Sequence, residues 1–151
     1  SWVIGDVTLG EDVNIWTNAV VRGDDDTVVI GARTTVLENC LIEAPTGNPV
    51  DIGEDVIISH GATVHGATVD AGCIVGIGAI VLDNARIGAK SIIGSGALVS
   101  PRSEIPMNQL VLGMPAKPVR ECKEAEHSYM AKEHERTLSK AKVYKKIYSQ
   151  E

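Results

Sequence analysis

Aliphatic residues recur at every sixth position through most of this chain, and we call these positions anchors. The series is Val3, Leu9, Ile15, Val21, Ile30, Val36, Ile42, Ile52, Ile58, Val64, Val69, Val75, Val81, Ile87, Ile93, Val99 and Ile105. A period of six matches neither the helical period of about 3.6 nor strand alternation, but it fits a short strand plus a corner. We therefore predict an all-β fold, a parallel β-helix in which three hexads make one triangular coil.

Small residues and glycines accompany the anchors. The position four residues after an anchor is mostly small or β-branched, at Val7, Val13, Ala19, Thr34, Cys40, Ala62, Thr68, Cys73, Ala79, Ala85, Ser91, Ala97 and Ser103. Glycine directly follows the anchor at Gly10, Gly31, Gly53, Gly76, Gly88 and Gly94. We expect the small side chains to fill tight corners and glycine to give the backbone freedom where the chain turns.

The repeat has two insertions and a definite end. Extra residues enter around Asp24–Thr27 and around Pro45–Pro49, and we expect both to project as loops. After Ile105 come a Pro-rich strap and then apolar or aromatic residues at helical spacing. That spacing is shown by Met130, His134, Leu138, Ala141, Tyr144 and Tyr148. We predict one domain: a β-helix over 1–112, a strap over 113–120, and an α-helix over 121–151 that covers strand surface.

Composition narrows the classes of function. The chain of 151 residues has no Phe and 3% aromatic residues, so its core must be narrow and regular. A net charge of −6 argues against a nucleic-acid partner, because phosphate binding needs clustered Lys and Arg. No apolar run approaches the roughly 18 residues of a membrane span. Three cysteines without CxxC spacing argue against disulfides and favour the reducing cytoplasm.

Three polar residues occupy equivalent positions in successive coils. Arg22, Glu43 and His65 each directly follow an anchor, three hexads apart, so they should form a column with a spacing of about 4.8 Å. Glu43 and His65 could therefore share one small cation. His60 belongs to the preceding hexad on another face, and a neighbouring subunit of a threefold trimer could present it.

Three segments carry a resemblance to a known family. WTNAVVRGD (16–24), ISHGATVHG (58–66) and VLGMPAKPVR (111–120), in this order over a hexad array, resemble the gamma-class carbonic anhydrases. The resemblance implies a left-handed helix, against the usual right-handed crossover rule, and a homotrimer acting on CO2 and bicarbonate. It also implies a metal held between subunits by three histidines. His60 and His65 match two of these ligands, and Glu43 stands in the place of the third.

The resemblance also assigns catalytic positions, and the chain departs from the family at several of them. Arg22 and Asp24 match the family's interface ion pair, and with Glu43 they form our candidate catalytic set. Leu37 stands where the family has a glutamine that orients the nucleophile, and Thr35 where it has an asparagine. A carboxylate is a legitimate zinc ligand, but it donates more charge than imidazole and should raise the pKa of bound water above about 7.

These departures predict weak or impaired CO2 hydration, with zinc as the expected metal and iron or cobalt as alternatives. Glu43 could instead simply pair with Arg22, and His60 and His65 could be surface residues. His127 and His134 on the predicted helix are expected to be structural. Two other functions stay open: a non-catalytic trimeric scaffold, and a hexapeptide acyltransferase, which would need to bind CoA. Bound zinc in the purified protein would favour the lyase.

Overall fold

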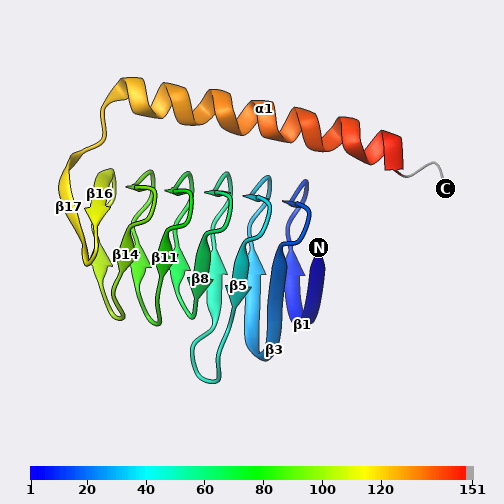
Figure 1. Ribbon diagram of the computed structural model, residues 1–151, viewed down its shortest axis with the longest axis horizontal. Helices are drawn as coiled ribbons and strands as arrows, with labels where there is room; N and C mark the ends of the chain where they lie inside the picture. The colour runs from blue at the N-terminus through cyan, green and yellow to red at the C-terminus, as the bar shows by residue number, and fades with distance from the viewer. Residues whose placement is uncertain (149–151) are drawn as a thin grey trace.

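The structure, a computed structural model, describes residues 1–148 as short strands stacked in successive coils, followed by one long helix (Figure 1). The strands are β1 (Trp2–Leu9), β2 (Asn14–Ile15), β3 (Val20–Ile30), β4 (Thr35–Val36), β5 (Leu41–Glu43), β6 (Val50–Ile52), β7 (Ile57–Ile58), β8 (Thr63–His65), β9 (Thr68–Val69), β10 (Ile74–Val75), β11 (Ile80–Val81), β12 (Arg86–Ile87), β13 (Ile92–Ile93), β14 (Leu98–Val99), β15 (Glu104–Ile105), β16 (Gln109–Gly113) and β17 (Ala116–Glu121). The helix is α1 (Glu124–Tyr148).

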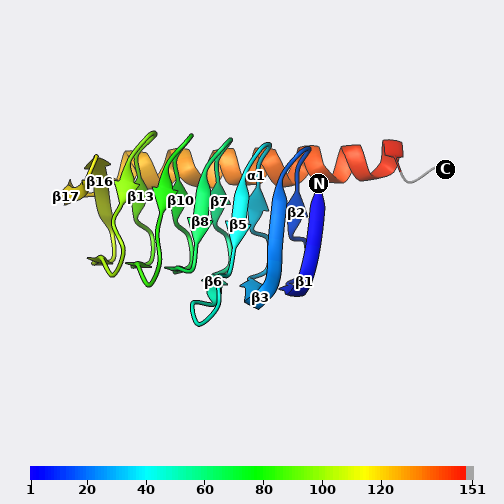
Figure 2. The ribbon, with the colours of Figure 1, turned by 60° about the horizontal axis from the view of Figure 1, so that its bottom comes forward.

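The strands form the three faces of a triangular prism. The first face runs in the order β14-β11-β8-β5-β3, the second in the order β3-β6-β9-β12-β15, and the third in the order β17-β16-β13-β10-β7-β4-β2. β3 bends around a corner and belongs to two faces, and β1 pairs with it alone. The strands lie side by side along the prism (Figure 2), and all pairs are parallel except β16 with β17. The predicted left-handed parallel β-helix is confirmed.

The anchors form the core. From Val21 to Val99 every anchor is at most 1% exposed. At the start of the series, Val3 and Leu9 are 47% and 41% exposed and do not belong to the core. These two residues lie on β1 in the first coil, which has a neighbouring coil on one side only, so part of their apolar surface stays in contact with water.

The glycines directly after an anchor do not have the left-handed backbone conformation. Positive φ occurs in the turns, three residues after an anchor, both in non-glycine residues that are mostly Asn or Asp, such as Asn39, and in glycines such as Gly61. A Cβ on Gly31 would lie 2.5 Å from the backbone N of Glu54, and one on Gly88 would lie 2.5 Å from the N of Met107. Glycine after the anchor therefore permits close approach of the next coil. The expectation that these glycines give freedom where the chain turns is wrong.

The two insertions differ in structure. Residues 44–49 form a projecting loop between β5 and β6, as expected (Figure 1). The expected loop around Asp24–Thr27 is instead part of β3, because β1 pairs with β3 on both sides of it, through Gly5 with Gly23 and Val7 with Val28. The extra residues are thus taken up as an irregularity inside a strand pair.

The prism ends in a hairpin and a helix. The strap residues belong to the antiparallel pair β16 and β17, joined at a cis Met114–Pro115 peptide bond. α1 begins at Glu124 rather than at the expected Glu121, and residues 149–151 of the expected helix lie outside the described residues. α1 runs back along the length of the prism over its third face (Figure 1). No helix within residues 1–148 is long and apolar enough to cross a membrane.

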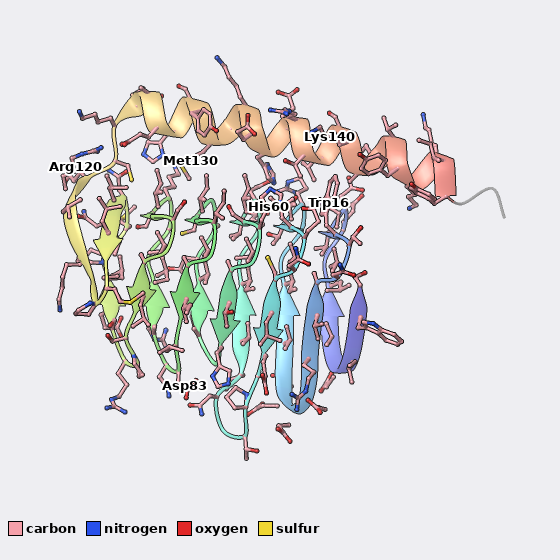
Figure 3. The ribbon with its side chains drawn as sticks, viewed as in Figure 1. Trp16, His60, Asp83, Arg120, Met130 and Lys140 are labelled. Carbon is pink, nitrogen blue, oxygen red and sulfur yellow. The ribbon has the colours of Figure 1, made fainter. Side chains whose placement is uncertain are left out.

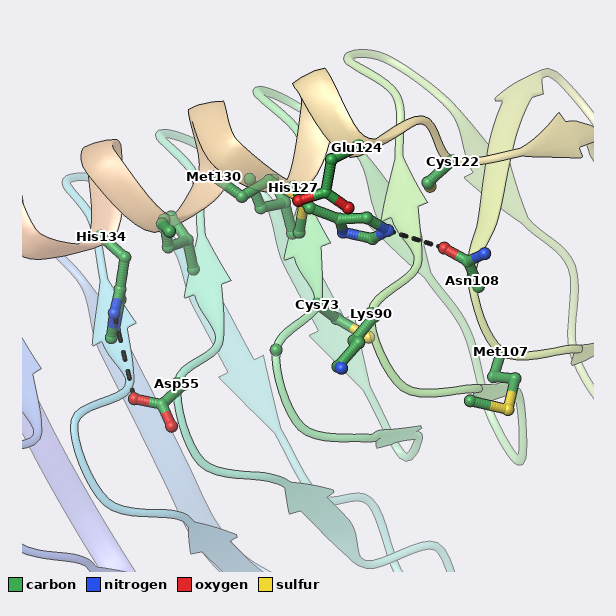
Figure 4. Close-up of a pocket in the computed structure, with 14 residues that line it drawn as sticks. Asp55, Cys73, Lys90, Met107, Asn108, Cys122, Glu124, His127, Met130 and His134 are labelled. Carbon is green, nitrogen blue, oxygen red and sulfur yellow. Dashed lines mark hydrogen bonds and ion pairs between the residues drawn. The ribbon is translucent and has the colours of Figure 1, made fainter.

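α1 contacts the prism through a few side chains. Met130 is buried, whereas Leu138 and Ala141 are half-buried and Tyr144 is 45% exposed. A groove of about 720 Å³ remains between the N-terminal half of α1 and the prism (Figure 4). Two histidines cross this groove: His127 Nε2 donates to Asn108 Oδ1 at 2.7 Å, and His134 Nε2 donates to the carbonyl oxygen of Arg33 at 2.7 Å. Both contacts fix the helix to the prism, which agrees with the structural role expected for these residues.

Candidate functional site

The column of polar residues is present on the first face. In the parallel pairing of β3, β5 and β8, Arg22 is in register with Glu43, and Glu43 with His65. Successive residues of the column are therefore one coil apart, about 4.8 Å between strands. All three lie where their strands reach the corner between the first and second faces. This part of the predicted geometry is confirmed.

Arg22 connects the column to the residues that follow it. Its Nε donates to Asp24 Oδ1 at 2.8 Å, and its Nη1 lies 3.1 Å from Glu43 Oε1. The hydrogen bond from Arg22 holds the pKa of Asp24 below its usual range and, in turn, raises the pKa of the guanidinium. Glu43 is thus paired with Arg22 through one carboxylate oxygen, the alternative that the sequence left open. A carboxylate has two oxygens, so this pairing does not by itself remove Glu43 as a metal ligand.

A carboxylate orients His65. Asp83, in the turn after β11, contacts the Nδ1 atom of His65 through Oδ1. The His65 side chain is 30% exposed and the Asp83 side chain 39% exposed, so the pair lies at the surface of the prism. An imidazole with Nδ1–H directed at a carboxylate has Nε2 as its unprotonated nitrogen, which is the arrangement that metal-binding histidines adopt.

His60 has a similar partner at the opposite edge of the first face. Its Nδ1 lies 2.7 Å from Glu38 Oε2, an ion-pair distance. The Glu38 Oε2 atom is buried and accepts no aligned hydrogen bond within residues 1–148, so the contact is electrostatic. His60 lies on the α1 side of the prism, whereas Asp83, the partner of His65, lies at the opposite edge (Figure 3).

One chain does not bring the three candidate ligands together. His60 lies in the turn before β8 and His65 is the last residue of β8, so the strand carries the two imidazoles to opposite edges of the first face. Within residues 1–148, no group of three or more His, Cys, Asp or Glu side chains converges on a common point. One edge of the first face therefore presents Glu43 and His65, and the other presents His60.

The donor groups fit a divalent metal. Both histidines have a carboxylate at Nδ1, so each can offer Nε2, and Glu43 adds an oxygen; two His and one Glu is a known zinc-ligand set. The surroundings of the set are less favourable. Leu37 is a half-buried aliphatic residue, and Thr35 Oγ1 is buried without a hydrogen-bond partner in the described chain. Neither can act as the amide donors of the resembled family.

Sequence reasoning missed Glu38 and Asp83. Glu38 follows its anchor by two residues, as His60 does one coil later on the same corner, so the column argument applied to this hexad position would have found the pair. Asp83 is harder to find. β11 pairs Val81 with Val64, which puts Asp83 one coil further and one residue beyond His65. This diagonal contact depends on side-chain direction rather than on register.

The cysteines are not part of the site. Cys40 and Cys73 are buried in the core, and burial raises the pKa of their thiols to about 11 and about 12, respectively. Their thiols remain protonated near neutral pH and are unsuited to metal binding or nucleophilic attack. They fill the small inward position, as expected.

Several proteins with similar sequences are named carbonic anhydrases. No family model matches the chain. A Methanocaldococcus jannaschii protein named probable carbonic anhydrase is 44% identical over 124 residues, covering 82% of this chain and 78% of its own. A Geobacillus kaustophilus carbonic anhydrase is 38% identical, over 98% of this chain and 81% of its own. Arabidopsis thaliana mitochondrial gamma carbonic anhydrase 2 is 31% identical over 94% of this chain, which spans 53% of that relative.

A similar solved structure carries a different description. A Bacillus cereus protein, the BC4754 gene product described as an acetyltransferase, has a TM-score of 0.94 and 34% sequence identity to this chain. The match covers 96% of this chain and 84% of that one. The same prism therefore occurs in a protein described as an acetyltransferase.

Proposed function

The chain belongs to the gamma-class carbonic anhydrase family, and from this premise we propose that it is a homotrimer that binds a divalent metal between subunits and hydrates CO2 weakly. The observation that carries the proposal is the arrangement of the first face. Glu43 and His65 lie in register at one edge, His60 lies at the other, and the Nδ1 atoms of both histidines face carboxylates. Cyclic symmetry brings opposite edges of neighbouring subunits together.

The residues have distinct roles in this proposal. His60 of one subunit and Glu43 and His65 of the next would hold the metal, with zinc as our first choice and iron or cobalt as alternatives. The bound metal would supply Lewis acidity, which makes hydroxide available from water near neutral pH. Asp83 keeps the imidazole of His65 in the required tautomer, and the negative charge of Glu38 favours a proton on Nδ1 of His60. Arg22 and Asp24 hold the corner of the subunit interface and limit the freedom of Glu43.

Two features reduce the expected activity. The carboxylate of Glu43 lowers the net charge of the site relative to three imidazoles, which weakens the Lewis acid. Leu37 has no group that can donate a hydrogen bond to the nucleophile, so orientation is lost as well. Both features can be reversed by substitution: Glu43→His restores the neutral donor, and Leu37→Gln restores the amide.

The test combines metal analysis with kinetics. Elemental analysis of protein purified without added metal should find a divalent metal, and titration should yield a saturable site. Asp83→Asn should weaken metal binding by about 10- to 100-fold, because His65 loses its orienting partner. Asp51→Asn is the control, since Asp51 is exposed on β6 of the second face. Stopped-flow CO2 hydration should rise in the order wild type, Glu43→His, then Glu43→His with Leu37→Gln.

The outcomes separate the alternatives. A wild-type rate equal to that of an efficient carbonic anhydrase would show that Glu43 is a competent ligand and that our account of its cost is wrong. A trimer that binds no metal would favour the scaffold. Saturable binding of CoA, with no metal, would favour the acyltransferase, the second candidate, which the Bacillus cereus structure supports by its description. We place the protein in the cytoplasm, where its three unpaired cysteines stay reduced.

A further inference from the structure

Three of the five aromatic residues of the chain line one pocket. The pocket has a volume of about 430 Å³ and lies between the first coils of the third face and the C-terminal turns of α1. Trp16 forms its wall on the prism, and Tyr144 and Tyr148 form its wall on the helix. Because the core of the prism contains no aromatic side chain, this grouping is not a consequence of core packing.

The rings are arranged as adjacent walls rather than as a stack. The Trp16 and Tyr144 ring centroids are 5.4 Å apart with the planes at 74°, and those of Tyr144 and Tyr148 are 6.3 Å apart at 55°. Trp16 Nε1 donates to Asn14 Oδ1 at 2.7 Å, which fixes the indole. Tyr144 and Tyr148 are 45% and 76% exposed, so both side chains remain accessible to a ligand from solvent.

The charge of the pocket is negative. Glu38 is the single charged residue among the described residues that line it. Its Oε2 atom is buried, and within residues 1–148 the one ion pair of its carboxylate is with the Nδ1 atom of His60. Lys142, on the neighbouring part of α1, is paired with Asp12 at 3.6 Å and does not line the pocket. Trp16 and His60 lie on the side of the prism that faces α1 (Figure 3).

We propose that this pocket binds a quaternary ammonium group of a small molecule, held against the faces of Trp16, Tyr144 and Tyr148 with Glu38 as counter-charge. The face of an aromatic ring carries the negative end of its quadrupole, and it attracts a cation within about 6 Å of the ring centroid. A quaternary ammonium cannot donate hydrogen bonds to water, so it loses little on entering an aromatic pocket. Anions are disfavoured by the same rings and by Glu38. The proposal does not depend on the metal.

The test uses Trp16 as the reporter. In a Trp2→Phe variant, Trp16 is the remaining tryptophan, and choline is titrated into metal-free protein at low ionic strength. We expect saturable quenching of its fluorescence, and calorimetry should give the same dissociation constant. The neutral isostere 3,3-dimethylbutan-1-ol has the shape of choline without its charge, and it should bind at least about tenfold more weakly if cation–π attraction dominates.

Matched variants locate the ligand. Tyr144→Leu should weaken choline binding by about tenfold, and Glu38→Gln by several-fold, about the loss of one favourable charge contact. Tyr129→Leu is the control, because Tyr129 is 63% exposed on the same helix outside the pocket. Circular dichroism verifies that each variant is folded. Equal binding of choline and its neutral isostere, unchanged binding in Tyr144→Leu, or the absence of saturation would overturn the proposal.

Discussion

At the scale of residues, two neighbouring threonines on the third face have opposite hydrogen-bond status. Thr34 and Thr35 are both fully buried. Thr34 Oγ1 donates to the carbonyl oxygen of Gly53 at 2.7 Å and accepts from the N–H of Val56 at 3.0 Å. Thr35 Oγ1 has no partner in residues 1–148. A buried hydroxyl without a partner loses its hydrogen bonds to water and gains none in the protein, which costs free energy. A hydroxyl with protein partners, such as that of Thr34, links two coils.

The two threonines therefore provide a matched prediction. Thr34→Val should lower the free energy of unfolding by about 1–3 kcal/mol, because Gly53 and Val56 lose a partner. Thr35→Val should leave it unchanged or raise it by up to about 1 kcal/mol. Urea denaturation followed by circular dichroism measures both. A Thr35→Val variant as unstable as Thr34→Val would mean that the Thr35 hydroxyl has a partner in solution.

At the scale of elements, α1 is held unevenly along its length. Met130 is 7% exposed, and Leu138 is half-buried beside a small pocket formed with Val13 and Asn14. The apolar stripe predicted both as packed positions. The cost of truncating a side chain depends on how completely it is enclosed, so the two positions should differ.

Truncation along the helix measures this difference. Met130→Ala should cost about 2–4 kcal/mol of unfolding free energy, and Leu138→Ala about 1–2 kcal/mol. Urea denaturation of each variant gives the values. Equal losses at both positions would show that the C-terminal half of α1 packs as tightly as its first turns.

The first turn of α1 is also coupled to pH. Arg120 donates to the Glu126 carboxylate from Nη1 and Nη2, at 2.8 and 2.6 Å. Glu126 also accepts a hydrogen bond from the backbone N–H of Lys123 at 2.7 Å. The hydrogen bond from Arg120 is the main cause that lowers the pKa of Glu126 from 4.5 to about 2. A carboxylate with a depressed pKa in the folded state stabilises it above the unfolded pKa, and this contribution disappears as pH falls from 4.5 to about 2.

Replacing Glu126 tests this coupling. Glu126→Gln should flatten the pH dependence of the melting temperature between about pH 4.5 and 2, because the glutamine does not titrate. Glu124→Gln is the control: Glu124 lies in the same helical turn and forms no ion pair within the described residues. A similar flattening in both variants would assign the effect to the charge of the helix N-terminus rather than to the Arg120 pair.

At the scale of the whole molecule, the separation of His60 from His65 predicts that the metal site is shared between subunits. His60→Ala and His65→Ala subunits should each bind no metal alone, but mixed trimers contain one junction with both histidines intact. Random mixing of equal amounts should recover about a quarter of the sites. Light scattering verifies the trimer, and metal bound per chain is the measurement. Trimers that regain no metal on mixing would exclude a shared site.

The sequence by itself determined the repeating part of this protein. A fixed period of six places equivalent residues in successive coils, so the period alone predicts the faces of the prism, the core from Val21 to Val99, and the register of Arg22, Glu43 and His65. These features depend on spacing along the chain. Because parallel strands of successive coils pair in register, residues at equal spacing lie directly above one another.

The tertiary structure decided what spacing does not encode. After the five-residue step, Ala67 takes the buried corner position expected for Thr68, which lies half-buried on β9. The pairing of Asp83 with His65, and the meeting of Trp16 with Tyr144, depend on side-chain direction and on where α1 lies over the third face. Such contacts join residues from different coils or from the helix, and their geometry is fixed by packing of the complete fold rather than by any local pattern.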